Sequence, residues 1–166
     1  MRPTERIKEA QRVLEAEARA IFASSKKISL NFSKCIDLII DCKGTVVISG
    51  IGKSGNIGKK ITSTLASLGT PSIFLHTSDA FHGDLGILRR NDLLICISNS
   101  GETDELVRLL NYANRNDIKS IAITGNVNST ISKEASVSLN SSVESEACPL
   151  NLAPTCSTCL LYTSDA

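Results

Sequence analysis

The sequence predicts a doubly wound α/β domain, in which a five-stranded parallel sheet is flanked by helices in three layers. Short apolar, β-branched runs alternate along the chain with amphipathic segments of helical period, which is the pattern of repeated βαβ units. The runs are apolar at consecutive positions, as expected for parallel strands that helices cover on both faces. A chain of 166 residues with 42% hydrophobic residues is long enough for one domain around a buried core.

The first 41 residues predict two leading helices. Apolar residues recur at helical spacing between charged ones and predict one long amphipathic helix over residues 5–25. Its apolar stripe could close the core or pair with a partner helix. Asn31 or Ser33 could cap a second helix that ends near Asp41.

Five apolar runs predict the strands of the sheet, at residues 45–49, 72–75, 93–97, 120–124 and 136–139. Helical segments separate them, at residues 54–68, from 102 or 103 to 116, and 129–134. Both histidines of the chain, His76 and His82, fall in a stretch predicted as a polar loop over residues 76–86. In a sheet of this kind, ligands bind outside the carboxyl ends of the strands.

A glycine-rich turn, Gly50-Ile51-Gly52-Lys53-Ser54-Gly55, follows the first predicted strand and opens a helix. Unpaired backbone N–H groups and the helix dipole favour an anion at such a place. The spacing fails the Walker A pattern, in which four residues separate the first glycine from Gly-Lys-Ser. The three glycines match a dinucleotide fingerprint, but no acidic residue follows the second strand to bind a ribose. A structural turn without a ligand remains an alternative.

A second polar turn, Ser98-Asn99-Ser100-Gly101-Glu102-Thr103, follows the third predicted strand. Helix capping accounts for one hydroxyl and one carboxylate of this turn. The remaining polar side chains have no such structural role unless a ligand binds to them. Hydroxyls and backbone amides can hold a phosphate without burying unpaired cations. Because both turns follow strand carboxyl ends, the sequence predicts a phosphate site at one edge of the sheet.

Composition excludes several classes of partner. A formal net charge of +1 gives no electrostatic case for nucleic acid or an acidic membrane. No apolar run approaches the roughly 20 residues of a membrane span, and the charged start does not resemble a secretory signal. We therefore expect a cytoplasmic protein with reduced thiols and no cofactor. Cys156 and Cys159 form a C-x-x-C pair, but no second pair stands at zinc spacing.

Taken together, the motifs resemble the sugar isomerase (SIS) family, whose domains bind phosphosugars on a flavodoxin- or Rossmann-like three-layer fold. The ordered set that carries the resemblance comprises residues 50–58, Leu68-Gly69-Thr70-Pro71, His82-Gly83-Asp84-Leu85-Gly86, residues 98–103, and Glu146-Ala147-Cys148-Pro149-Leu150-Asn151-Leu152-Ala153-Pro154-Thr155. The resemblance implies reversible aldose–ketose isomerisation of ribulose 5-phosphate and arabinose 5-phosphate, on the route to the lipopolysaccharide sugar Kdo. It also implies a homo-oligomer, a dimer or a tetramer.

The resemblance further implies roles for individual residues. The positions that match the family's catalytic set are Lys53, Glu105 and Glu146. The positions that match its substrate contacts are Gly52, Ser54, His82, Ser98, Asn99, Ser100 and Thr103. His82 also matches a histidine implicated in contact with an inhibitory metal. The alternative for Lys53 and Glu146 is a solvated side chain, and for Glu105 a first-turn carboxylate favoured by the helix dipole. We prefer Glu146 to Glu105 as the base, because it stands in an irregular loop beside the most specific motif.

The chain also departs from the family pattern. Full-length members continue with a Ser-His-Pro-Gly-Gly segment, which holds another active-site histidine, and with paired CBS domains, and neither occurs here. We expect a phosphosugar-binding domain over residues 1–158, with leading helices over 1–41, and a truncated or non-native tail over 159–166. The expectation is that the chain is inactive or weakly active as it stands. A non-catalytic phosphosugar sensor is the runner-up, and a metal-binding tail with Cys148, Cys156 and Cys159 is a third possibility.

Overall fold

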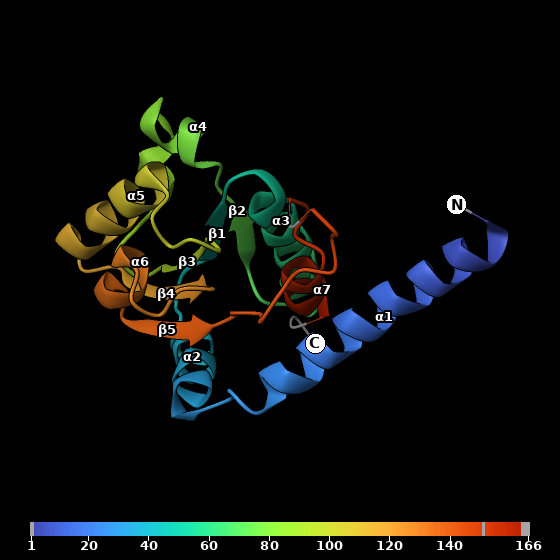
Figure 1. Cartoon of the computed structure of the whole chain (residues 1–166). Helices are drawn as coiled ribbons and strands as arrows, with labels where there is room; N and C mark the ends of the chain where they lie inside the picture. The colour runs from blue at the N-terminus through green and yellow to red at the C-terminus, as the bar shows by residue number, and fades with distance from the viewer. Residues whose placement is uncertain (1, 151, 164–166) are drawn as a thin grey trace.

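The structure, a computed structural model, describes residues 2–150 and 152–163 and confirms a five-stranded parallel α/β sheet. The strands lie in the order β2-β1-β3-β4-β5 (Figure 1). Their bounds are β1 Val46–Gly50, β2 Ser72–Phe74, β3 Leu93–Ile97, β4 Lys119–Thr124 and β5 Val137–Asn140. Every neighbouring pair is parallel. Each predicted strand is present, with ends that differ by one residue at most.

The strand order reverses between β1 and β3. From β1 the chain crosses to β2 on one side and then returns to β3 on the other, where Val46 pairs with Leu93 and Gly50 with Ile97. In doubly wound sheets such a reversal leaves a crevice at the carboxyl ends of the two central strands. Residues 51 and 98, which follow these paired ends, therefore begin two turns that flank the crevice.

Helices cover both faces of the sheet, so the core has two halves. The helices α4 Thr77–Phe81, α5 Asp104–Arg115 and α6 Thr130–Glu134 pack with Val47, Leu94 and Ala122. On the opposite face, α2 Leu30–Asp41, α3 Gly52–Ser67 and α7 Cys156–Thr163 pack with Ile48, Ile95 and Ile121. Successive strand residues point to opposite faces, which is why the strands are apolar at consecutive positions. All five residues of β1 and all five of β3 are buried.

Three local predictions need correction. The helix predicted from residue 54 begins at Gly52, so Lys53 and Ser54 lie in its first turn. The stretch predicted as a polar loop contains the helix α4 and the 3-10 helix η1 Asp84–Ile87. Helices this short show no readable period, and α4 is capped by His76, whose Nδ1 accepts a hydrogen bond from Ser78 N. The cap of α2 is Ser29, whose Oγ accepts from Asn31 N.

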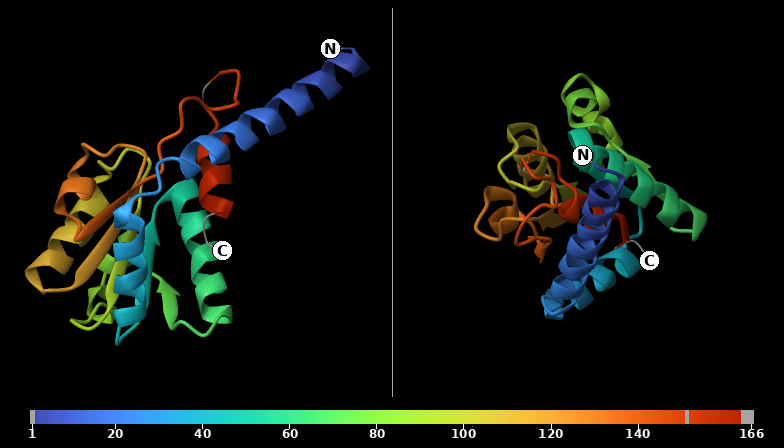
Figure 2. Two further views of the ribbon diagram at one scale, coloured as in Figure 1. Left: turned by 90° about the horizontal axis from the view of Figure 1, so that it is seen from below. Right: turned by 45° about the vertical axis from the view of Figure 1, so that its right-hand side comes forward.

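The helix α1 Pro3–Ser25 extends away from the sheet past α7 (Figures 1 and 2). None of its residues is buried, and two of its faces differ in their exposure to solvent. The half-buried face includes Glu9, Val13, Ala16 and Ala20, and it turns toward α7 and the loop before it. The opposite face carries Ile7, Leu14 and Ile21 in exposed positions, one every seven residues. Within the described part of the chain, no helix has the length and apolar character to cross a membrane.

Candidate functional site

The glycine turn brings the start of α3 against the ends of β1 and β3. A Cβ atom on Gly50 would lie 3.1 Å from both Gly55 N and Ile97 O. A Cβ atom on Gly55 would lie 2.7 Å from Gly50 O, which is closer than real Cβ atoms approach. Glycine is therefore needed here for close packing of helix on strand. Gly52, by contrast, has a positive φ of 59° and open space around it, so it serves the turn itself.

Lys53 contributes to a basic cavity beside this turn. The cavity has a volume of about 370 Å³, and its lining includes Lys53, Lys59, Phe74 and His76. The Lys59 ammonium lies 5.3 Å from the centroid of the Phe74 ring, a cation–π contact that draws it over the cavity wall. The start of α3 adds the partial positive charge of a helix N-terminus. The cavity beside the carboxyl end of β1 is therefore suited to bind a negatively charged part of a ligand.

The serine turn after β3 forms a cluster of hydroxyl groups. Ser98 Oγ lies 2.9 Å from Thr103 Oγ1 and 3.4 Å from Ser100 Oγ. Ser98 Oγ also accepts a hydrogen bond from Gly101 N, at 3.1 Å. Each hydroxyl can rotate its proton, so a cluster that bonds internally can also donate to an anion that enters the turn. Three of the predicted phosphate contacts thus lie side by side.

Neighbouring elements hold the serine turn in place. Asn99 O accepts from Gly125 N at 3.1 Å, which joins the turn to the end of β4. Gly101 has a φ of 69°, and its carbonyl accepts from Ile131 N of α6 at 3.2 Å. The carboxylate of Glu102 reaches Thr130 on the same helix. Sequence reasoning treated Glu102 only as a partner for the dipole of its own helix, because no local signal reveals a contact across 28 residues.

Glu146 lies in the loop before α7, the helix that packs beside α3. Its Oε2 accepts hydrogen bonds from Thr155 N at 2.7 Å and from Ser157 N at 3.3 Å. Its Oε1 accepts a short hydrogen bond from Ser157 Oγ. Burial alone would raise the pKa of Glu146, but the bonds from Ser157 and Thr155 outweigh it and leave the pKa below its ordinary value. The carboxylate is therefore ionised at neutral pH and caps the start of α7.

A second cavity, of about 440 Å³, opens beside Glu146. Its lining includes Asn99 from the serine turn, Gly125 from the end of β4, and Glu144, Glu146 and Cys148 from the loop before α7. This cavity combines carboxylates with an amide and a thiol, whereas the first cavity is basic. The serine turn borders the second cavity through Asn99, and the glycine turn after the neighbouring strand β1 lines the first.

The structure brings some of the predicted site residues together and separates others. Ser98, Ser100 and Thr103 form one cluster, whereas Lys53 and Glu146 line different cavities. Glu105 is exposed in the first turn of α5.

The remaining predicted positions lie around this cluster. Gly52 and Ser54 lie in the first turn of α3, and Asn99 reaches the second cavity. His82 is exposed at the end of α4. Among the described residues, no group of three or more histidine, cysteine or acidic side chains could hold a metal ion. The six cysteines, all among the described residues, form no disulfide bond.

The arrangement along the sheet edge defines what the site can do chemically. Hydroxyls and backbone amides at its centre can bind a phosphate. The Lys53 ammonium group can stabilise developing negative charge, and the ionised Glu146 carboxylate can accept a proton. The site is therefore equipped for proton transfer on a small phosphorylated substrate.

Comparison with known proteins gives a consistent family assignment. The model of the SIS domain family matches residues 38–164. The arabinose 5-phosphate isomerase KdsD of Pseudomonas aeruginosa is 48% identical over 152 residues, which cover 92% of this chain and 47% of the relative. The arabinose 5-phosphate isomerase KpsF of Escherichia coli O6:H1 is 48% identical over 159 residues, which cover 93% of this chain and 47% of the relative. The chain thus spans about half the length of these curated relatives.

Solved structures agree with the fold. A protein of E. coli CFT073, solved in complex with arabinose 5-phosphate, superposes with a TM-score of 0.94 at 35% identity, and the match covers 99% of this chain and 88% of that one. The NanR protein of Vibrio vulnificus, at 18% identity and a TM-score of 0.77, shares the fold. The similarity therefore extends over nearly all of the chain, including the helix α1 and the loop before α7.

Proposed function

The chain belongs to the SIS domain family, and we propose that it binds a phosphorylated pentose and supplies catalytic groups for an aldose–ketose isomerase. The reaction that we propose interconverts D-ribulose 5-phosphate and D-arabinose 5-phosphate. The observation that carries the proposal is the hydroxyl cluster of Ser98, Ser100 and Thr103 at the reversal point of the sheet. Relatives 48% identical to this chain are named for the same reaction.

The phosphate occupies the serine turn in this proposal. Hydroxyls of the turn and the backbone N–H groups at the start of α5 donate to its oxygens, as helix N-termini do in other anion sites. The turn is already held by β4 and α6, so little conformational entropy is lost when the phosphate binds. Asn99, Gly52, Ser54 and His82 are the further contacts that we propose, toward the sugar.

The chemical step needs a base and a stabiliser of negative charge. In the direction from ketose to aldose, a base removes a proton from C1, an enediolate forms, the hydroxyl proton moves from O1 to O2, and a proton is returned to C2. The ionised carboxylate of Glu146 is the base that we propose, with Glu105 as the second carboxylate of the catalytic set. Lys53 stabilises the negative charge that develops on the enediolate oxygens. Lys53 and Glu146 line different cavities, so C1 and C2 of the pentose must lie where both side chains can reach them, with C5 carrying the phosphate to the serine turn.

We also propose that the protein forms a homo-oligomer through α1. Ile7 and Leu14 are 59% and 67% exposed, and Ile21 continues the same stripe at 36%. A spacing of seven residues keeps apolar side chains on one face of a helix, which is how helices pair in coiled coils. The opposite face of α1 turns toward α7, so the stripe remains open to a second copy.

A binding experiment tests the proposal most directly. We would titrate the chain with arabinose 5-phosphate in a calorimeter, compare Ser98→Ala with the matched control Ser132→Ala, and follow interconversion of the two pentose phosphates by NMR. Ser132 of α6 donates a hydrogen bond to Ser138 of β5, and neither residue is a predicted substrate contact. We expect Ser98→Ala alone to weaken binding by about tenfold or more. Equal affinity in both variants would remove the phosphate site, and turnover above the background rate, even if weak, would favour the isomerase over a sensor.

A further inference from the structure

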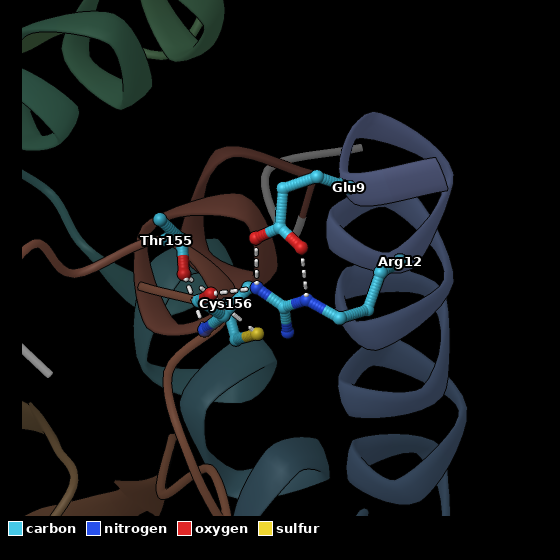
Figure 3. A network of polar contacts seen from close by, with 5 residues as sticks. Glu9, Arg12, Thr155 and Cys156 are labelled. Atoms are coloured by element: carbon cyan, nitrogen blue, oxygen red, sulfur yellow. Dashed lines mark hydrogen bonds and ion pairs between the residues drawn. The ribbon is translucent and has the colours of Figure 1, made fainter. Parts of the chain in front are cut away.

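Arg12 connects the helix α1 to the loop that carries Glu146. Glu9, one turn earlier on α1, holds the guanidinium of Arg12 through two hydrogen bonds, of 2.9 and 2.7 Å. The same guanidinium donates from Nη2 to Ala147 O at 2.6 Å, across 135 residues of sequence. Figure 3 shows the guanidinium between Glu9 and the start of α7, at Thr155 and Cys156. The contact therefore joins two segments that are distant in the chain.

Ala147 is fixed at both of its backbone polar groups. Its carbonyl accepts from Arg12, and its N–H donates to Thr155 Oγ1 at 2.8 Å. Thr155 N in turn donates to the carboxylate of Glu146 at 2.7 Å. Ala147 is 2% exposed, so water cannot readily replace either partner. Arg12, Ala147, Thr155 and Glu146 thus form one continuous network of hydrogen bonds.

We propose that Arg12 is a positioning residue, which fixes the peptide after Glu146 and thereby sets where the Glu146 carboxylate lies. This inference rests on the proposed function, because it assumes that Glu146 acts on the substrate. Arg12 itself touches no predicted substrate contact. Through Arg12, the placement of α1 thus determines the position of the Glu146 carboxylate, the group that accepts the proton.

The ion pair of Arg12 and Glu9 is open to solvent, which favours a positioning role for Arg12 over a contribution to the stability of the fold. The side chains of Arg12 and Glu9 are 45% and 39% exposed, and ion pairs this open to solvent add little to folding. The carbonyl of Ala147, by contrast, is buried and accepts a charge-assisted hydrogen bond, which is stronger and more directional. The described residues of the loop between β5 and α7, 141–150 and 152–155, form no helix or strand, so hydrogen bonds are needed to hold Glu146 in its place.

The experiment compares Arg12→Ala with Arg12→Lys and with the control Arg19→Ala. Arg19 pairs with Glu15 at 3.6 Å on the same helix, and both side chains are 68% exposed. The first measurement is the titration of the Glu146 carboxyl by ¹³C NMR, which needs no activity. The second is kcat, KM and the pH profile of kcat for isomerisation of arabinose 5-phosphate. Circular dichroism checks that each variant is folded.

We expect Arg12→Ala to raise the pKa of Glu146, because the bonds from Thr155 and Ser157 loosen. We also expect kcat to fall about tenfold with KM nearly unchanged, since small displacements of a reacting group have effects of this size. Arg12→Lys should recover part of both effects, and Arg19→Ala should match the wild type. An unchanged Glu146 titration in folded Arg12→Ala, or an equal change in Arg19→Ala, would overturn the inference. If the wild type does not bind arabinose 5-phosphate, the proposed function fails while the NMR result still decides the role of Arg12.

Discussion

The carboxylate of Glu102 accepts hydrogen bonds from both the backbone N–H and the hydroxyl of Thr130, at 2.9 and 2.7 Å. This pair joins the serine turn after β3 to the first turn of α6. A second bond, from Ile131 N to Gly101 O, runs beside it at 3.2 Å. The proposed phosphate site therefore depends on a helix that contributes no predicted ligand contact of its own.

We predict that Glu102→Gln weakens binding of arabinose 5-phosphate. The neutral amide has one acceptor atom in place of two, so the anchor to Thr130 is partly lost and the serine turn gains freedom. A decrease of about three- to tenfold in affinity is expected, which is the value of one hydrogen bond. Calorimetry measures it, with Asp104→Asn as the matched control, because Asp104 is a nearby carboxylate in the first turn of α5. Equal affinity in Glu102→Gln and the wild type would contradict the anchoring role.

The same anchor should depend on pH. The side-chain and backbone bonds from Thr130 lower the pKa of Glu102 below its ordinary value. A carboxyl whose pKa is lower in the folded state stabilises that state above its unfolded pKa, which is about 4.3 for glutamate. The anchor is thus complete at neutral pH and is lost as the pH falls through the folded pKa. We expect the affinity difference between wild type and Glu102→Gln to shrink below about pH 4.

Gly101 offers a test of the packing behind the serine turn. A Cβ atom there would collide with Ser129 Oγ, and the φ of 69° already disfavours other residues. We predict that Gly101→Ala lowers the free energy of unfolding by about 2–4 kcal/mol, through strain and overpacking together. The control is Gly69→Ala. Gly69 has a φ of 89°, and a Cβ atom there would have no neighbour within 4 Å, so Gly69→Ala should lose only about 1 kcal/mol, from backbone strain. Urea unfolding measures both, and equal losses would show that packing against Ser129 contributes nothing.

Much of the fold could be predicted because it depends on local patterns. Consecutive apolar residues gave the strands, and helical periodicity gave α1, α3 and α5 with small errors at their ends. The contacts that close the site could not be predicted in the same way. Glu102 with Thr130 and Arg12 with Ala147 are 28 and 135 residues apart, and no local sequence pattern marks either pair. Such pairs become visible only when the chain has folded.

The cap of α7 by Glu146 illustrates a further limit. Glu146, Thr155 and Ser157 were all part of, or next to, the motif that resembled the family, yet the motif does not reveal which backbone groups the carboxylate would meet. The catalytic residues remain predictions for this reason. Their types and their order along the chain could be recognised, whereas the separation of Lys53 and Glu146 into two cavities depends on the sheet order and on the path of the loop.

The cysteines should differ strongly in reactivity toward a thiol reagent. Burial raises the pKa of Cys96 to about 12 and that of Cys35 to about 11, so neither forms thiolate near neutral pH in the folded state. Cys148 lines the second cavity, and Cys42 lies elsewhere, near Asn91. We predict that arabinose 5-phosphate slows labelling of Cys148 and leaves Cys42 unchanged, as mass spectrometry of labelled peptides would show. Protection of both thiols, or of neither, would count against a substrate beside Glu146.

Self-association through α1 can be tested by a single substitution that introduces a charged side chain. We predict that Leu14→Arg converts the oligomer into a monomer, because the arginine would be buried without a partner in the middle of the stripe. Leu68→Arg is the control, since Leu68 is 73% exposed at the end of α3, away from the stripe. Sedimentation equilibrium gives the mass of each. An unchanged mass for Leu14→Arg would place the interface elsewhere.

Because Ser157 donates a hydrogen bond to Glu146, removal of the Ser157 hydroxyl should destabilise the fold by an amount that depends on pH. Ser157 is 5% exposed and donates to the carboxylate from both its hydroxyl and its N–H. Ser157→Ala removes the hydroxyl donor and should lower the free energy of unfolding by about 1–2 kcal/mol at neutral pH. Because the bonds lower the pKa of Glu146, their contribution exists above the unfolded pKa of about 4.3 and is lost as the pH falls through the folded value.

Urea unfolding of wild type and Ser157→Ala, measured from about pH 7 down to about pH 3, tests this sign. The two stabilities should converge as Glu146 becomes protonated, and Ser157→Ala should raise the pKa of Glu146 when its carboxyl is followed by NMR. Ser132→Ala is the matched control, because Ser132 bonds to the neutral hydroxyl of Ser138 and its effect should not vary with pH. A Ser157→Ala effect that stays constant over the whole pH range would mean that Ser157 stabilises α7 without involving the charge on Glu146.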